Sequence, residues 1–336
     1  MRKNIFICLA ILLIVLDVQC TGVLSSGHGS EKTEVQEIEL LRINYLDIAP
    51  SNVAHPGDTI FIRMGVENIG QDDVVLFIDT DASACDRGDL LLYSICEPLY
   101  TVKVFRVLSA TSGMTTAMVD VNYDGENESV CALKLKPDEA AVFSWEISAP
   151  TEDELFGMIH ECTFKFRVTY KSLARTIAYV YFASPEEIAQ RIYTREEMSM
   201  AGNNIATFGP VVAMVTAENQ PYPAGSSFTL PVHLENRGKG IADVLDLQIK
   251  YPRDFSVTEE RCELFEKKEE NKLALRSTDL TKKMLQIYGG KSTHFHCEFK
   301  VPSVSILTPY RFEVTATYLY SIFEEKKIKV VPYGKE

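Results

Sequence analysis

The chain has 336 residues, enough for two domains of ordinary size, because single hydrophobic cores usually stop growing below that length. Acidic residues outnumber Lys and Arg by 47 to 34, which gives a formal net charge of -13. Proteins that bind nucleic acid carry a basic footprint, so this charge argues against a nucleic-acid partner.

The first 20 residues predict a secretory signal peptide. Two basic residues precede an unbroken apolar run over residues 5–16, which is shorter than the roughly 18 residues that a membrane-spanning helix needs. We expect cleavage before Thr21 and export of the mature chain, with residues 21–35 as a linker. An uncleaved anchor and a lipidated Cys20 are the alternatives, and only these would bring the protein into contact with a membrane.

Cleavage would leave six cysteines, namely Cys85, Cys96, Cys131, Cys162, Cys262 and Cys297. An exported protein meets an oxidising environment, so an even number of cysteines predicts three disulfide bonds rather than metal or redox chemistry. The favoured pairing joins Cys85 to Cys96, Cys131 to Cys162, and Cys262 to Cys297. The four cysteines of the first half allow three pairings, so the first two bonds stay open.

The sequence contains one structural unit twice. Three blocks recur in the same order in each half: residues 57–70 with 225–238, 133–150 with 285–302, and 164–170 with 310–316. Each block alternates apolar and other residues with a period of two, which is typical of half-buried strands. Both copies of the first block end with the sequence Glu-Asn-x-Gly, which predicts that the strand is followed by a turn.

Many short strands separated by turn signals predict an all-β fold of two tandem immunoglobulin-like antiparallel β-sandwiches. The first domain is expected over residues 36–184 and the second over residues 209–336. A short, partly helical linker over residues 185–208 joins them, because Ser184 offers an N-cap followed by proline and glutamates. We expect the two domains to fold independently and proteases to cut the linker after its helix, around residues 194–208.

The residues of both repeats carry a family resemblance. Pro-Gly-Asp-Thr at residues 56–59 and Val-Glu-Asn-Ile-Gly at residues 66–70 resemble CARDB-type (cell-adhesion-related) Ig-like domains. The tandem arrangement, with Phe-Ser-Trp-Glu-Ile-Ser-Ala-Pro at residues 143–150 and the alternating strand at residues 164–170, is similar to S-layer-type Ig-like modules of archaeal surface proteins. The resemblance covers most of both repeats. It implies a sandwich fold and a cell-surface location, and it carries over no catalytic residue.

An acidic turn in the first half is a candidate calcium loop. Asp120, Asn122 and Asp124 alternate before a glycine, and Glu128 adds a further carboxylate. Cys131 stands where a bidentate glutamate would complete the loop, so the alternative is an ordinary hairpin turned at Asp-Gly. Any ion bound here would be calcium, held weakly and for structure, and no other cofactor is expected.

Three smaller features complete the candidate sites. Asn127 begins the sequence Asn-Glu-Ser in the same turn, which makes it a candidate glycosylation site in an exported chain. His294 and His296 share one face of a predicted strand, but a third metal ligand is missing, so two solvent-facing histidines are the favoured interpretation. The acidic residues between Asp79 and Asp89 suggest either an ion or partner surface or simply a solvated loop.

The sequence carries no nucleophile-elbow, zinc-protease, phosphate-loop or dinucleotide motif, so we expect no enzymatic activity. The favoured function is a structural or adhesive protein of the cell surface that binds protein or glycan through loops or an exposed sheet edge. The alternative is an accessory or ligand-binding subunit of an exported complex, tethered by its N-terminal segment.

Overall fold

The computed structural model describes residues 39–80, 85–96, 99–110, 114–119, 128–194, 203–257, 261–262, 264–276, 278 and 285–334. Most of these residues lie in β-strands, and nearly all strand pairs are antiparallel, which confirms the predicted all-β sandwich fold. Neither helix within these ranges is long and apolar enough to span a bilayer.

One four-stranded sheet belongs to the first repeat. Its strands lie in the order β1 (Leu41–Ala49), β3 (Thr59–Asn68), β9 (Ala140–Ser148) and β6 (Thr101–Ser109). The alternation predicted for the first repeated block is present in β3, where every second side chain from Ile60 to Val66 is fully buried. One face of this sheet therefore supplies half of a sandwich core.

A second four-stranded sheet repeats this arrangement in the second half of the chain. Its strands lie in the order β12 (Val211–Val215), β14 (Ser227–Asn236), β20 (Ser292–Lys300) and β16 (Ser256–Val257). The first repeated block forms β3 in one sheet and β14 in the other, and the second block supplies β9 and β20. The sequence repeat is therefore a structural repeat.

The third sheet is shared by both repeats. Its main path runs β17 (Phe265–Glu269), β18 (Lys272–Leu275), β15 (Ile241–Lys250), β21 (Thr308–Val330), β10 (His160–Ala183), β4 (Val74–Asp79), β8 (Glu128–Leu135) and β7 (Met114–Val119). Shorter strands pair beside this path: β2 (Val53–Ala54), β5 (Leu92–Ser94), β11 (Asn203–Ala206), β13 (Tyr222–Pro223) and β19 (Gln286–Tyr288).

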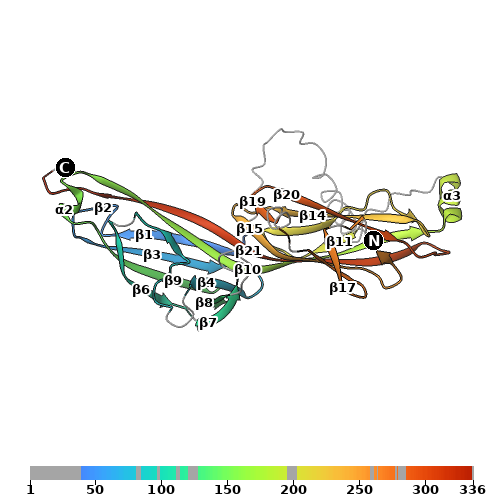
Figure 1. The fold of residues 1–336 in the computed structure, drawn as a ribbon, viewed down its shortest axis with the longest axis horizontal. Helices are drawn as coiled ribbons and strands as arrows, with labels where there is room; N and C mark the ends of the chain where they lie inside the picture. Colours follow the sequence, from blue (N-terminus) through green and yellow to red (C-terminus); the bar gives the residue numbers. More distant parts are fainter. Residues whose placement is uncertain are drawn as a thin grey trace, which may run out of the picture. The chain divides into compact units, whose positions relative to one another are not determined.

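The two longest strands, β10 and β21, pair antiparallel along nearly their whole lengths, and Figure 1 shows them side by side. Strand β10 lines both sandwich cores. Its Phe166 packs against Trp145 of β9 with ring centroids 5.5 Å apart, and its Phe182 packs against Phe228 of β14 at 5.2 Å. The long strands thus belong to both repeats. The domain boundary and the independent folding expected from the sequence stay predictions.

The long-strand pairing is symmetric about one residue pair. Ser172 of β10 lies opposite Tyr318 of β21. The matching blocks, residues 164–170 and 310–316, lie equally far before these two residues in their own strands. The repeats are therefore related by a local two-fold arrangement in the shared sheet.

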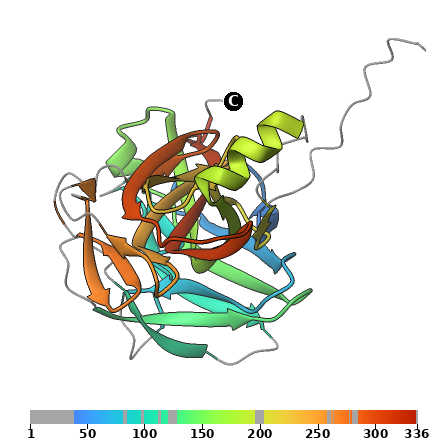
Figure 2. The same cartoon turned by 90° about the vertical axis from the view of Figure 1, so that its right-hand side faces the viewer.

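The predicted helix of the linker is present as α3 (Pro185–Thr194), and the Ser184 hydroxyl caps it by accepting a hydrogen bond from the backbone N–H of Glu187 at 3.2 Å. Ile306 lies beside α3, and Figure 2 is viewed from the side on which α3 lies. Part of the expected linker is a strand, because β11 pairs with β10. Residues 195–202 lie outside the described residues. A second, short helix, α2 (Glu152–Leu155), connects β9 to β10.

Candidate binding groove

The disulfide bonds define the candidate site, and two of the three differ from the favoured pairing. Cys262 and Cys297 are bonded as predicted. The predicted bonds of Cys85 with Cys96 and of Cys131 with Cys162 are wrong: the structure joins Cys85 to Cys131 and Cys96 to Cys162, with Cα atoms 5.6 and 5.8 Å apart. Both separations are normal for disulfides.

The observed pairing follows from strand register. Cys131 of β8 lies opposite Asp79 at the end of β4, and the chain returns to that point with Cys85. Ser94 of β5 lies opposite Lys165 of β10, which brings Cys96 beside Cys162. Sequence spacing alone did not reveal these neighbours. The consequence is that residues 85–96, here called the wall segment, are fastened to the shared sheet at both ends.

Internal hydrogen bonds shape the start of the wall segment. The buried Asp79 carboxylate accepts hydrogen bonds from the backbone N–H groups of Arg87 and Gly88 at 2.7 and 3.1 Å. Asp89 accepts from the Thr80 backbone and hydroxyl at 2.9 and 2.6 Å. Both carboxylates are thus used to fold the loop, whereas the sequence had suggested an acidic ion or partner surface as one of two interpretations.

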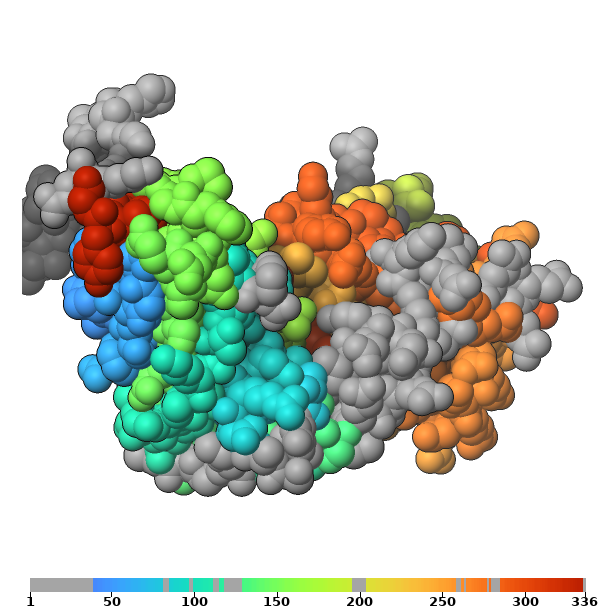
Figure 3. All heavy atoms as spheres, turned by 60° about the vertical axis from the view of Figure 1, so that its left-hand side comes forward, coloured from blue at the N-terminus to red at the C-terminus, as the bar shows by residue number. Residues whose placement is uncertain are grey.

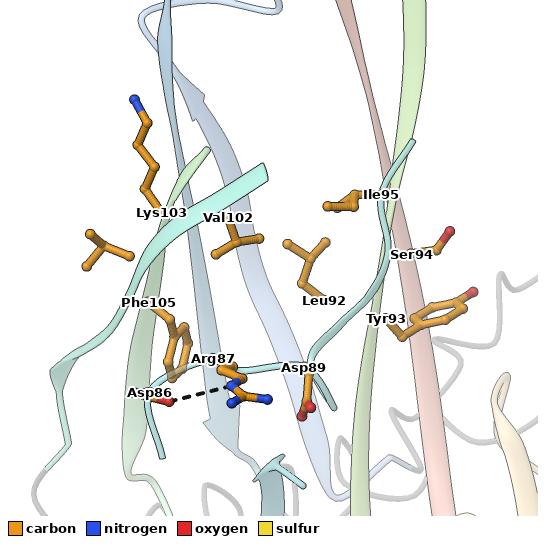
Figure 4. A pocket seen from close by; sticks show the side chains of 11 residues that line it. Asp86, Arg87, Asp89, Leu92, Tyr93, Ser94, Ile95, Val102, Lys103 and Phe105 are labelled. Atoms are coloured by element: carbon orange, nitrogen blue, oxygen red, sulfur yellow. Dashed lines mark ion pairs between the residues drawn. The ribbon is translucent and has the colours of Figure 1, made fainter. Parts of the chain in front are cut away.

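The wall segment and β6 enclose a groove with a volume of about 600 Å³. In Figure 4, Val102 of β6 faces Leu92 and Ile95 of the wall segment, while Tyr93 points to the other side of the wall. The groove has an apolar floor and charged ends, lined by Asp86, Arg87, Asp89 and Lys103. Its volume lies within the range of about 300–1,000 Å³ that is usual for ligand sites.

The wall segment packs closely on β6 at one point. Gly88 has a φ of +62°, and a Cβ atom there would lie 2.6 Å from the ring of Phe105. Phe105 is itself buried and packs on Trp145, with ring centroids 5.3 Å apart. Only glycine combines this backbone conformation with this approach. The position of the wall over the sandwich core therefore depends on Gly88.

Contacts on the outer side of the wall hold it against the shared sheet. The backbone N–H of Arg167 on β10 donates to the carbonyl of Leu91 at 2.7 Å. The guanidinium of Arg167 lies 5.4 Å from the ring centre of Tyr93, a cation–π contact, and Tyr93 also meets Phe323 edge-on at 6.1 Å. The wall is therefore anchored by two covalent bonds, backbone hydrogen bonds and ring contacts.

Strand β6 is an edge strand of its sheet, because within the described ranges it pairs only with β9. Register shifts occur between Val102 and Val104 and between Val107 and Ser109, with a regular stretch between them. Bulges and an exposed lysine such as Lys103 are common means of preventing edge-to-edge pairing of identical sheets. Among the residues that the structure describes, no strand pairs with the outer edge of this regular stretch, which lies beside the groove. Figure 3 shows this region, in cyan and teal, at the surface.

The groove carries both signs of charge. Asp86 and Arg87 lie 4.0 Å apart and are largely exposed, and the ammonium group of Lys103 makes no ion pair with the residues that the structure describes. Just before β6, burial raises the pKa of Tyr100 to about 12, so its hydroxyl stays protonated at neutral pH. Asp86, Arg87 and Lys103 supply hydrogen-bond donors and acceptors at the rim of the groove, whereas the buried Tyr100 hydroxyl lies 3.3 Å from Nδ1 of His160.

Several predicted site residues fall outside the described part of the chain. Asp120, Asn122, Asp124 and the glycosylation candidate Asn127 lie there, and only the backbone of Glu128 is described, as the first residue of β8. The calcium loop and the glycosylation stay predictions. Among the described residues, no cluster of three or more His, Cys, Asp or Glu side chains suits a metal ion.

His294 and His296 are both exposed on one face of β20, as the favoured interpretation of the sequence had it. The sequence did not reveal that His233 of β14 lies opposite His294. No strand was predicted from the sequence at β6, although Thr101–Ser109 alternates as a strand does. Alternation identifies a strand, but it does not tell whether the strand lies at an edge.

No protein-family model matches the chain. No characterised protein matches it in sequence. Among solved structures, the secreted serine protease VesC from Vibrio cholerae aligns with 84% of this chain at 9% identity and a TM-score of 0.15, and the alignment spans 50% of that protein.

Two further solved structures align with more of their own length. The C-terminal domain of the Streptococcus agalactiae AgI/II polypeptide BspA aligns over 83% of this chain and 92% of that domain, with 10% identity and a TM-score of 0.15. The collagen binding domain of the Erysipelothrix rhusiopathiae surface protein RspB aligns over 88% and 91%, with 10% identity and a TM-score of 0.12. These values are too low to support an argument about function.

Proposed function

We propose that this chain is a non-enzymatic binding module of the cell exterior, which holds an extended segment of a partner protein along β6. The observation that carries the proposal is the regular stretch of β6, whose outer edge pairs with no strand of the described ranges, beside a groove whose far wall is fixed by two disulfides. An added strand would gain backbone hydrogen bonds from β6, and its alternate side chains would enter the groove.

A protein partner suits this groove better than a glycan. Sugar binding favours exposed aromatic faces, but Tyr93 points away from the groove and Phe105 is buried beneath it. The apolar side chains of Leu92, Ile95 and Val102 suit aliphatic or aromatic side chains of a peptide. Charged groups at the ends of the groove would select among such peptides.

Three disulfides support a location outside the reducing cytosol, because such bonds persist in oxidising compartments. The proposal includes three expectations from the sequence. The chain resembles CARDB-type and archaeal S-layer-type modules, its signal peptide is cleaved, and it has no enzymatic activity. All of these describe a surface protein that works by binding.

The test is selection of displayed random linear peptides on the mature chain, followed by amide hydrogen exchange with a selected peptide bound. We expect slower exchange in the Val104–Val107 stretch of β6. Ile95→Asp places a charge in the groove and should abolish binding, whereas Leu245→Asp, at an exposed position on β15, should leave it unchanged. Peptides that bind both variants equally and leave β6 exchange unaltered would overturn the proposal.

A further inference from the structure

Two histidines of the second repeat form a cross-strand pair. His233 of β14 lies directly opposite His294 of β20, and their ring centroids are 4.2 Å apart with planes at 82°. Their neighbours in sequence, such as Val232 and Phe295, are buried in the core, so both imidazoles lie on the outward face of the sheet. His294 is exposed and His233 half-buried. Two imidazoles this close can reach one ion without movement of the strands.

A hydroxyl group lies within reach of Nε2 of each ring. The Thr216 hydroxyl oxygen lies 3.0 Å from Nε2 of His233, and the Ser292 hydroxyl oxygen lies 3.5 Å from Nε2 of His294. Histidines that bind metals usually donate their second ring N–H to an oxygen, which fixes the tautomer. With Nε2–H donated to these hydroxyls, Nδ1 of each ring keeps its lone pair for a metal.

The local charges are compatible with a bound cation. Arg237 lies on the same side, but its guanidinium is paired with the Glu235 carboxylate at 2.8 Å. This pair offsets the positive charge near the site.

We propose that His233 and His294 together bind one divalent first-row transition-metal ion, and Cu²⁺ in preference to Zn²⁺ or Ni²⁺. Imidazole nitrogen suits all three ions, and for a given set of ligands copper binds most tightly. No third His, Cys, Asp or Glu completes a cluster here among the described residues, so water fills the remaining positions. His296 lies opposite Pro231 and is outside the pair. The site is independent of the groove in the first repeat.

The test is titration of the untagged mature chain with Cu²⁺, followed by calorimetry and by electron paramagnetic resonance. We expect one tight equivalent whose spectrum shows two coordinated nitrogens. Loss of groups that only orient ligands weakens metal binding by about 10–100-fold, so His233→Gln and His294→Gln should each raise the Kd at least about tenfold. His296→Gln is the matched control on the same strand face and should leave the Kd unchanged.

The melting temperature gives a second measurement that does not depend on the spectrum. Bound Cu²⁺ should raise it in the wild-type chain and in His296→Gln, but not in the double variant of His233 and His294. Both positions are on the outward face, so the variants keep the core intact. Equal Cu²⁺ affinity of the double variant and the wild-type chain would overturn the proposal, as would an equal loss in His296→Gln.

Discussion

Asn68 and Asn236 occupy the same place in the two repeats, at the ends of β3 and β14, and their buried side chains make matching hydrogen bonds. Each Nδ2 donates to two backbone carbonyl oxygens: those of Asp72 and Leu135 at 2.8 and 3.0 Å in the first repeat, and those of Gly240 and Ile287 at 3.0 and 2.8 Å in the second. Each Oδ1 accepts from the backbone N–H two residues later. The repeated Glu-Asn-x-Gly is therefore a corner that joins the two sheets of each sandwich.

Asn68→Ala and Asn236→Ala should each lower the free energy of unfolding by about 2–4 kcal/mol, because two backbone carbonyl groups in each repeat lose the hydrogen bond that the asparagine amide donates. Urea denaturation measures this directly. Asn44→Ala is the control, since Asn44 is an exposed asparagine whose amide donates to the Glu67 side chain and accepts from the Arg42 side chain, with no backbone partner among the described residues. Equal effects of the buried and exposed changes would contradict a structural role for the corner.

Glu39 makes stability depend on pH. Its Oε1 accepts hydrogen bonds from the backbone N–H of Lys239 at 2.7 Å and from the Tyr320 hydroxyl at 3.0 Å, while Oε2 is buried without a partner among the described residues. Burial raises the pKa of Glu39 above 4.5, and the hydrogen bonds only partly oppose this. The folded state therefore holds the proton more tightly than the unfolded state does.

This raised pKa determines the sign of the effect. The contribution of Glu39 to stability is fully present below the ordinary carboxyl pKa and is lost as pH rises through the folded value. Glu39→Gln keeps an oxygen for both donors and removes the buried charge. We expect this variant to melt higher than the wild-type chain at pH 7, with the difference vanishing near pH 4. Melting curves across this range test it, and a constant difference would contradict it.

Reduction of the two disulfides of the first repeat should release the wall segment. Replacing Cys96 and Cys162 by serine opens a large loop, and a native disulfide of this kind contributes about 2–5 kcal/mol. Peptide binding to the groove should be lost even at temperatures where the variant remains folded. Surface plasmon resonance with a selected peptide measures this loss.

The matched control is the double serine variant of Cys262 and Cys297, which removes the disulfide of the second repeat. It should lower stability by a comparable amount and leave peptide binding unchanged at temperatures where the chain is folded. Loss of binding in both variants would mean that general stability, rather than the anchored wall, governs the groove.

The shared strands bear on how the halves fold. Fragments 39–194 and 203–334 each lack one of the two long strands, β21 or β10. The shared strands lead to a prediction that differs from the independent folding expected from the repeat. Neither fragment should melt cooperatively by itself, and the mixture should recover a cooperative transition, because the pairing of β10 with β21 completes both sandwiches. Differential scanning calorimetry of the fragments and their mixture is the test. Cooperative melting of each fragment alone would support the independent folding that the repeat predicts.

The sequence was sufficient to predict the strands that show a clear alternation of apolar and polar residues. The repeated blocks became β3 and β14, β9 and β20, and parts of β10 and β21, and Ser184 capped the helix as predicted. These features depend on side-chain periodicity and capping chemistry, which act over a few residues. The disulfide of Cys262 and Cys297 was predictable because no other cysteine is in that half.

The features that the sequence did not reveal depend on pairing between distant segments. Whether Cys85 meets Cys96 or Cys131 is decided by the register of β4 against β8, and alternation does not encode register between strands far apart. The same holds for the pairing of His233 with His294 and for the edge position of β6. Both proposed sites arise from this kind of long-range placement.

The symmetry of the long strands about Ser172 and Tyr318 has a consequence for assembly at low concentration. A chain with a single repeat would leave much of its long strand with unpaired backbone groups, which a second copy could satisfy through the same two-fold pairing. Such a dimer would dissociate on dilution. Placing both copies in one polypeptide makes the encounter intramolecular, so the shared sheet persists however dilute the protein becomes.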